Sequence, residues 1–242
     1  MRQSLPFTVS FFMSDSSPAA SIAAWVFDAY GTLFDVHSLA VIAERLAPGK
    51  GAALSRLWRT KQLEYTWLAS LMALRPREDF AALTGKALDY ATAALDLPWG
   101  SDERAQLISA YRSLTPFPDA KATLIGLAPR PRWILSNGTL AMLEPLLQAS
   151  GIDSLLDGVL SVDAAGIFKP APQVYQLAVD RLRLAPAQIG FVSANGWDAT
   201  GAKAFGLTTF WINRGDQPVE RHGPPPNFIV GSLAELPELV GG

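Results

Sequence analysis

Residues that could do chemistry stand at a few separated points of this 242-residue chain, each after a short apolar segment or in a loop near one. A carboxylate at the end of a strand can act as a nucleophile, a general base or a metal ligand. A hydroxyl group and backbone amides before a helix can hold an anion. The groups in question are Asp28, Ser136-Asn137-Gly138, Lys169 and the polar stretch 193–198.

The elements that would position these residues alternate along the chain from about residue 115 onward. Alternation of short apolar strands with helices predicts parallel strands joined by right-handed crossovers. The segment 25–27 needs a partner and finds one only in this sheet. We therefore predict an α/β fold with a Rossmann-like parallel-sheet core. The predicted strands are 25–27, 133–135, 159–161, 189–192, 208–212 and 228–230, and the predicted helices between them are 139–150, 172–184 and 198–205.

The stretch from residue 38 to residue 114 has helical periodicity throughout and predicts an inserted helical cap subdomain. The α/β core domain is then built from residues 23–37 and 115–242. Residues 1–22 are interpreted as a disordered extension, or as the product of a start codon placed before a true start at Met13. The apolar stretch at the beginning is interrupted and weakly basic, which is a poor match to a signal peptide.

In open α/β sheets, ligands bind beyond the carboxyl ends of the strands. That rule brings Asp28, Ser136, Lys169 and Asp198 to one edge, next to the point where the insertion leaves. A lysine about 4 Å from Asp28 would stabilise its charged form by about 4 kcal/mol at an effective dielectric constant near 20. Asp28 would then stay ionised, as a nucleophile must.

Each of these signals alone has an ordinary structural explanation. A single aspartate after a strand is more often a helix cap or turn former, and Ser-Asn-Gly is more often a plain turn. Trp197 and Tyr175 would be core residues by default. Arg59 shares a helical stripe with three polar residues, which by itself predicts a solvated face. Those residues are Gln62, Thr66 and Ser70.

Composition excludes several classes of site. The chain has no cysteine and only two histidines, which excludes disulfides, thiolate zinc sites and a cysteine nucleophile and leaves little for a histidine metal site. The net charge of −2 gives no broad field toward nucleic acid or anionic lipid, and 49% hydrophobic against 17% charged residues favours a well-buried globule. We expect no nucleic-acid partner and no membrane span, and a cytoplasmic location.

Taken together, the motifs resemble those of the haloacid dehalogenase superfamily over residues 23 to 235. The four segments that carry this resemblance are Phe27-Asp28-Ala29-Tyr30-Gly31-Thr32, Leu135-Ser136-Asn137-Gly138, Lys169-Pro170 and residues 193–201. Residues 58–67, Trp-Arg-Thr-Lys-Gln-Leu-Glu-Tyr-Thr-Trp, resemble the cap of its L-2-haloacid dehalogenase branch. Thr60 and Ala69 depart from longer polar residues common in that branch, which leaves substrate size open.

Two positions separate this branch from the magnesium phosphatases that make up most of the superfamily. Those enzymes carry an acid two residues after the nucleophile, where this chain has Tyr30, and a magnesium ligand four residues before the last carboxylate, where it has Ala194. Tyrosine, with a pKa near 10, is a poor general acid, and magnesium prefers carboxylate ligands. We therefore expect neither a metal nor another cofactor.

The resemblance implies a role for each site residue in the displacement of halide from a small 2-haloacid. Asp28 attacks the halogen-bearing carbon and forms an ester that water hydrolyses. Lys169 keeps Asp28 charged, while Thr32 and Ser193 position its oxygens. Asp198 supports Lys169 and the hydrolytic water.

The same resemblance implies the binding residues. Ser136 and Asn137, with nearby backbone amides, would hold the substrate carboxylate, and Tyr30 would line the same site. Arg59, Asn195 and Trp197 would receive the halide, and Tyr175 would lie near Lys169. Phe80 is a candidate pocket aromatic. The family also implies a homodimer. The alternatives are a divergent phosphatase and an inactive scaffold that dimerises through the cap.

Overall fold

The computed structural model describes residues 18–73 and 75–241, so most of the expected N-terminal extension, residues 1–17, lies outside the described residues. The prediction places residues 18–22 in that extension, but they belong to the folded core. Pro18–Ser21 form a short 3-10 helix, and Ala19 and Ile22 are buried with the other core side chains. Arg130 also donates a hydrogen bond to the carbonyl of Ile22 at 3.0 Å. The predicted boundary at residue 23 is therefore too late.

A single sheet of six parallel strands forms the core of the described chain, in the order β3-β2-β1-β4-β5-β6. β1 lies in its centre, where Phe27 is paired with Ile134 on one side and Val192 on the other. The central strands are continuous apolar runs because helices cover both faces. The predicted α/β fold is confirmed. The strands are β1 (Ala24–Phe27), β2 (Arg132–Ser136), β3 (Gly158–Ser161), β4 (Ile189–Ser193), β5 (Thr208–Ile212) and β6 (Phe228–Val230).

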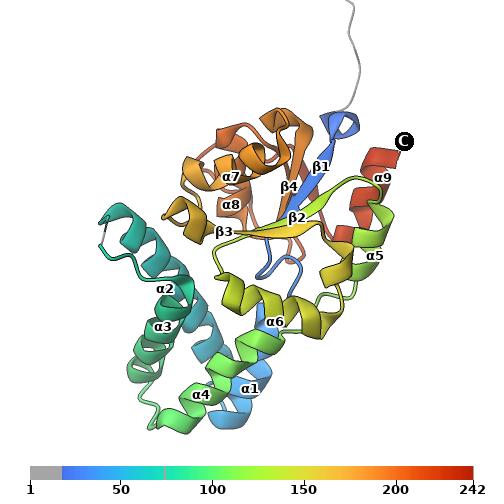
Figure 1. Ribbon diagram of the computed structural model, residues 1–242. Helices are drawn as coiled ribbons and strands as arrows, with labels where there is room; N and C mark the ends of the chain where they lie inside the picture. Colours follow the sequence, from blue (N-terminus) through green and yellow to red (C-terminus); the bar gives the residue numbers. More distant parts are fainter. Residues whose placement is uncertain (1–17, 74, 242) are drawn as a thin grey trace, which may run out of the picture.

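Helices flank this sheet, with α7 and α8 on one side and α5 and α9 on the other (Figure 1). Their bounds are α5 (Ala120–Gly126), α6 (Leu140–Ser150), α7 (Pro172–Leu182), α8 (Gly196–Phe205) and α9 (Leu236–Gly241). Pro172 is the first residue of α7, where a backbone N–H would have no partner within the helix. Gly151 and Gly206 follow the last residues of α6 and α8 and adopt the left-handed conformation that ends a helix. We did not predict α5 and α9, because helices this short show no clear apolar period.

The inserted helices lie together as a second body beside the sheet (Figure 1). They are α1 (Leu39–Leu46), α2 (Gly51–Leu71), α3 (Phe80–Ala94) and α4 (Ser101–Ala110). The chain leaves the core and returns to it at one place, since the N–H of Asp35 bonds to the carbonyl of Thr115 at 2.9 Å. The insertion therefore stands over the edge of the sheet at which β1 ends.

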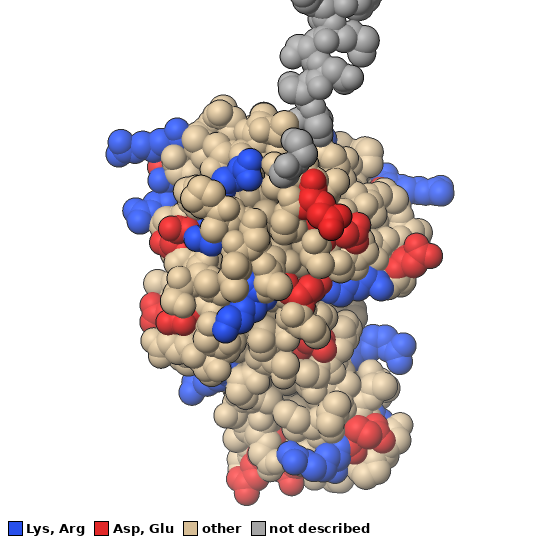
Figure 2. Space-filling model, turned by 90° about the vertical axis from the view of Figure 1, so that its right-hand side faces the viewer, with Lys and Arg blue, Asp and Glu red and all other residues tan. Residues whose placement is uncertain are grey.

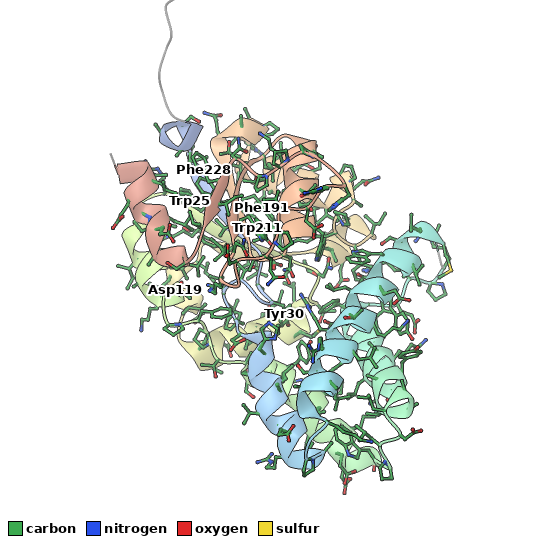
Figure 3. All side chains as sticks on the ribbon, turned by 180° about the vertical axis from the view of Figure 1, so that it is seen from behind. Trp25, Tyr30, Asp119, Phe191, Trp211 and Phe228 are labelled. Carbon is green, nitrogen blue, oxygen red and sulfur yellow. The ribbon has the colours of Figure 1, made fainter. Side chains whose placement is uncertain are left out.

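Aromatic side chains fill the space around the sheet. Trp25, Phe191, Trp211 and Phe228 lie along it, whereas Tyr30 lies between the sheet and the inserted helices (Figure 3). The ring of Phe210 is 5.0 Å from that of Trp25 and 4.7 Å from that of Phe228, measured between centroids. This packed core fixes the position of the strand ends.

Charged side chains of both signs are scattered over the face shown in Figure 2. That face therefore presents no extended region of one sign. In the part of the chain that the structure describes, no helix combines the length and apolar character needed to span a membrane.

Candidate active site

Asp28 lies at the carboxyl end of β1, buried, and both of its carboxylate oxygens accept hydrogen bonds. Its N–H bonds to the carbonyl of Val192, which continues the pairing with β4 by one residue. Lys169 Nζ donates to Oδ1 at 3.0 Å. Thr32 Oγ1 donates to Oδ2 at 3.0 Å, and Asn195 Nδ2 donates to the same oxygen at 2.8 Å. Three donors from three separate loops thus orient one carboxylate.

Lys169 is fully buried between two carboxylates. Its Nζ lies 3.0 Å from Asp28 and 2.9 Å from Asp198, and 5.0 Å from the centroid of the Phe191 ring. Asp198 Oδ1 in turn accepts a hydrogen bond of 2.8 Å from the hydroxyl of Tyr175. The chain Asp28–Lys169–Asp198–Tyr175 is a continuous network closed off from solvent.

The pKa values in this network follow from burial and from the neighbouring charges. Burial alone would lower the pKa of Lys169, but Asp198 and Asp28 outweigh it and raise that pKa above the ordinary value. Burial raises the pKa of Asp198, although Lys169 opposes the shift. Burial and then the charge of Asp198 raise the pKa of Tyr175 well above its usual value. Lys169 is therefore a permanent cation and Tyr175 a permanent donor near neutral pH.

The loop after β4 supports Asp28 through a short series of hydrogen bonds. Thr32 Oγ1 accepts the N–H of Ala194 at 2.9 Å while it donates to Asp28. Ser193 Oγ accepts the N–H of Asn195 at 3.1 Å. Ser193 was expected to touch Asp28. It instead holds the backbone of Asn195, and its link to the carboxylate passes through that residue.

Ser136 ends β2 and Asn137 follows it, and both are buried. Asn137 Oδ1 accepts the backbone N–H of Lys169 at 3.0 Å, so it joins the second loop to the third. Ser136 Oγ accepts the N–H of Gly138 at 3.1 Å, which leaves its hydrogen to be donated elsewhere. Gly138 must lack a side chain, because a Cβ there would lie 2.8 Å from the Tyr30 ring.

Tyr30 occupies the position where a phosphatase would carry its general acid. Its ring packs against Phe80 and Tyr111 from the inserted helices, with centroids 5.8 and 5.7 Å away. Its buried hydroxyl has no hydrogen-bond partner among the described residues. Burial raises the pKa of this hydroxyl far above the usual tyrosine value, so Tyr30 stays neutral.

Arg59 reaches the site from α2. Its Nη2 lies 3.4 Å from Asn195 Oδ1 and 3.5 Å from the carbonyl of Tyr30, and its Nη1 donates to Gln62 Oε1 at 2.7 Å. The solvated stripe predicted for this helix is wrong, because Gln62 and Thr66 are fully buried. That face of α2 packs against α3, where Gln62 Nε2 donates to Thr84 Oγ1, while the Thr66 hydroxyl donates to the carbonyl of Leu63 within α2.

A small cavity with about 240 Å³ of empty space joins these groups. A hollow of about 1140 Å³ lies beside it and shares Lys169 and Trp197, but Asp28 does not line it, so we place the chemistry in the smaller cavity. Leu63 lines the smaller cavity. The sequence does not predict this role, because one leucine on an amphipathic helix carries no functional signal. The lining residues are Asp28, Tyr30, Arg59, Leu63, Phe80, Ser136, Asn137, Lys169, Asn195 and Trp197.

The two aromatic residues that resembled core residues in the sequence have different surroundings. Tyr175 is fully buried, yet its hydroxyl also bonds to Asp198. Trp197 is half-buried, packs edge-on against Trp67 at 5.4 Å between ring centroids, and lines the cavity.

The charged side chains that line the cavity are one anionic group, Asp28, and two cations, Arg59 and Lys169.

The site does not suit the magnesium ion that the fold implies. The oxygens of Asp28 are engaged by Lys169, Thr32 and Asn195, and Ala194 offers only a methyl group where a ligand would stand. Within residues 18–73 and 75–241, no three His, Cys, Asp or Glu side chains are grouped so that they could hold a metal ion.

The family model of the haloacid dehalogenase-like hydrolases matches residues 22–206. The chain belongs to this family. It is 41% identical to an (S)-2-haloacid dehalogenase of Xanthobacter autotrophicus, over 91% of this chain and 96% of the relative. It is 44% identical to (S)-2-haloacid dehalogenase 4A of Burkholderia cepacia, over 91% and 95% of the two chains.

A solved structure gives the same result. The L-2-haloacid dehalogenase from X. autotrophicus, with chloropropionic acid covalently bound, superposes with a TM-score of 0.86 at 41% identity. The superposition covers 91% of this chain and 99% of that chain. The resemblance to the L-2-haloacid dehalogenase branch that the motifs indicated is thereby confirmed.

Proposed function

We propose that this enzyme hydrolyses short-chain (S)-2-haloacids to (R)-2-hydroxyacids through an ester formed on Asp28, without a metal ion. The observation that carries the proposal is the buried Asp28 carboxylate, held by Lys169, Thr32 and Asn195 and facing a cavity that Arg59 closes. Such a carboxylate is buried, paired with a lysine and oriented, as in-line attack on carbon requires.

In the first step, one oxygen of Asp28 bonds to C2 of the substrate as the carbon–halogen bond breaks. The halide leaves with the bonding electrons toward Arg59 and Asn195, on the side of the cavity roofed by α2. Ser136, whose hydrogen is available, and the backbone amides beside it bind the substrate carboxylate. The positive charge of Arg59 stabilises the charge that develops on the halogen.

In the second step, water attacks the carboxyl carbon of the Asp28 ester. The bond from that carbon to the substrate oxygen breaks, the hydroxyacid leaves with an oxygen of Asp28, and the carboxylate is restored with an oxygen from water. We assign the first proton from water to Asp198, because its raised pKa makes it a stronger base than an exposed aspartate. Asp198 returns this proton to the oxygen of the leaving hydroxyacid, and the second proton of water passes to solvent as the Asp28 carboxylate re-forms. Lys169, between the two carboxylates, stabilises the negative tetrahedral intermediate.

Tyr30 and Ala194 argue against the phosphatase alternative. A neutral phenol of very high pKa cannot supply the proton that a phosphatase general acid gives to its leaving group. The substrate of a phosphatase is also a dianion, and this cavity is small and partly apolar through Tyr30, Leu63 and Phe80.

A single-turnover experiment tests the proposed function. Excess enzyme is incubated with (S)-2-chloropropionate in ¹⁸O-water with a chelator present. We expect chloride release, (R)-2-hydroxypropionate, and label in the Asp28 carboxylate. The Asp28→Asn variant should lose at least about a thousandfold in rate. Labelled product with unlabelled Asp28 would mean direct attack by water and would refute the ester, while strict magnesium dependence would favour the phosphatase.

The homodimer is a further part of the proposal. Exposed apolar side chains near the end of α2 support it, since Leu68, Leu71 and Met72 are 39%, 82% and 58% exposed. Light scattering of the purified protein should give the mass of two chains, and the Leu71→Arg variant should give a lower mass.

The cytoplasmic location stays a prediction, which cell fractionation would test.

A further inference from the structure

Gln62 is the closest partner of Arg59 in the structure, although it does not line the cavity. Arg59 Nη1 donates to Gln62 Oε1 at 2.7 Å, whereas the contacts of Nη2 with Asn195 and with the Tyr30 carbonyl are 3.4 and 3.5 Å long. Gln62 is fully buried one helical turn after Arg59 on α2. This amide therefore gives the guanidinium its shortest hydrogen bond, and the Tyr111 hydroxyl, which also contacts Arg59, is bonded to the same amide oxygen.

The amide of Gln62 is itself held in one orientation. Its Nε2 donates to Thr84 Oγ1 at 2.6 Å, and that hydroxyl donates to the carbonyl of Phe80 at 2.6 Å. Because the only hydrogen of the Thr84 hydroxyl goes to a carbonyl, this oxygen can only accept from Gln62. The amide oxygen must then point the other way, where Arg59 and the hydroxyl of Tyr111, at 3.3 Å, both donate to it.

The partners of Arg59 are neutral, unlike those of four other arginines. Arg77, Arg104, Arg132 and Arg214 each pair with an aspartate. In the described part of the chain, the hydrogen bonds of Arg59 go to neutral oxygens, and the shortest of them is to Gln62 Oε1. A carboxylate at the position of Gln62 would neutralise the guanidinium and repel both a substrate anion and a departing halide.

We propose that Gln62 is a positioning residue that aims Arg59 at the leaving halide and keeps its positive charge unpaired. This inference rests on the proposed function, because it assigns the halide to Arg59. Gln62 acts through Arg59 and touches neither the substrate nor Asp28. Its effect must therefore appear in the steps that depend on the halide.

Two variants of Gln62 test the proposal. Gln62→Met keeps the length of the side chain and removes the acceptor, and Gln62→Glu keeps the shape and adds a negative charge. The inhibition constants of chloride and bromide ions are measured, together with kcat for (S)-2-chloropropionate and (S)-2-bromopropionate. In Gln62→Met we expect halide inhibition to weaken by about 10- to 100-fold, as for loss of a hydrogen bond to a charged group. The chloro substrate should lose more in kcat than the bromo substrate, because chloride is the poorer leaving group. Gln62→Glu should weaken halide inhibition further.

Thr66→Val is the matched control. Thr66 is buried on the same face of α2, one turn further along, and its hydroxyl donates to the carbonyl of Leu63 within the helix. This variant should leave halide inhibition and the bromo-to-chloro ratio of kcat unchanged. Circular dichroism melting checks that each variant is folded. If Gln62→Met does not fold, Gln62→Glu decides alone.

The outcomes separate this proposal from the proposed function. A wild-type enzyme that releases no halide would refute the function itself. An active wild type with equal losses for both halogens and unchanged halide inhibition in a folded Gln62 variant would overturn the role of Gln62 and leave the function standing.

Discussion

At the scale of single residues, the decisive feature is a buried cation shared by two carboxylates. Lys169 contacts both Asp28 and Asp198 at about equal distances, and it is fully buried. One positive charge thus holds the nucleophile and the proposed base in a fixed relation. Asp28 is further bound by Thr32 and Asn195, which leaves little freedom to its carboxylate. The reactivity of Asp28 comes from this arrangement.

The raised pKa of Lys169 predicts the alkaline side of the pH profile. The two carboxylates raise that pKa above 10.5, so the lysine keeps its proton as pH rises to that value. We expect kcat/KM for (S)-2-chloropropionate to show no alkaline decline due to Lys169 below pH 10.5. The profile of the Lys169→Arg variant is the comparison, because arginine stays protonated throughout. An alkaline limb below pH 10.5 that disappears in this variant would contradict the prediction.

At the scale of elements, the ends of three strands meet two of the inserted helices. Asp28, Ser136 and Ser193 stand at the ends of β1, β2 and β4, which the sheet holds side by side. The inserted helices supply the opposite wall, with Arg59 on α2 and Phe80 on α3. These helices are therefore part of the site. Phe80 is the first residue of α3, so the position of this side chain in the cavity depends on where α3 begins.

The start of α3 gives a prediction on stability. Asp79 caps this helix, and its side chain accepts the N–H of Ala82 at 2.8 Å. Asp79→Ala should lower the free energy of unfolding by about 1 kcal/mol, because the first turn loses a partner for its N–H groups. Asp79→Ser retains an acceptor and should lose much less. Urea unfolding followed by circular dichroism measures both, and equal losses for Ala and Ser would exclude the cap as the cause.

At the scale of the whole molecule, the site is a small cavity between the sheet and the inserted helices. Tyr30 stands at their boundary (Figure 3), where it packs against Tyr111. Closure removes water from Asp28 and Lys169, and the same burial raises the pKa values of Tyr30, Tyr111 and Tyr175. The folded protein therefore holds several protons that the unfolded chain would release.

This burial predicts a loss of stability at alkaline pH. In the unfolded chain, tyrosine and lysine lose their protons near their ordinary pKa values of 10.0 and 10.5. In the folded protein these pKa values are raised for the three buried tyrosines and for Lys169. Between the unfolded-state pKa and the folded-state pKa of each group, the native state binds more protons than the unfolded chain. The free energy of unfolding that is present below pH 10 therefore falls as pH rises, by about 1.4 kcal/mol per pH unit for each group. The buried tyrosines should ionise only on unfolding, with absorbance at 295 nm and circular dichroism changing together. Ionisation of all tyrosines before any loss of circular dichroism would refute this.

The sequence by itself determined the α/β core, most strand positions and the set of residues at the strand ends, because apolar periodicity and motif spacing are local properties. It also shows Tyr30 and Ala194 at the two positions where magnesium phosphatases carry acidic residues, which argues against phosphatase activity. Only the tertiary structure decided which face of α2 is buried. The stripe of Gln62, Thr66 and Ser70 is polar in the sequence, but Gln62 finds its partner Thr84 on α3, and Thr66 and Ser70 bond to carbonyls within α2. Likewise, the enclosure of Tyr30 depends on its packing against Tyr111, about eighty residues away in the chain, and no local pattern encodes that contact.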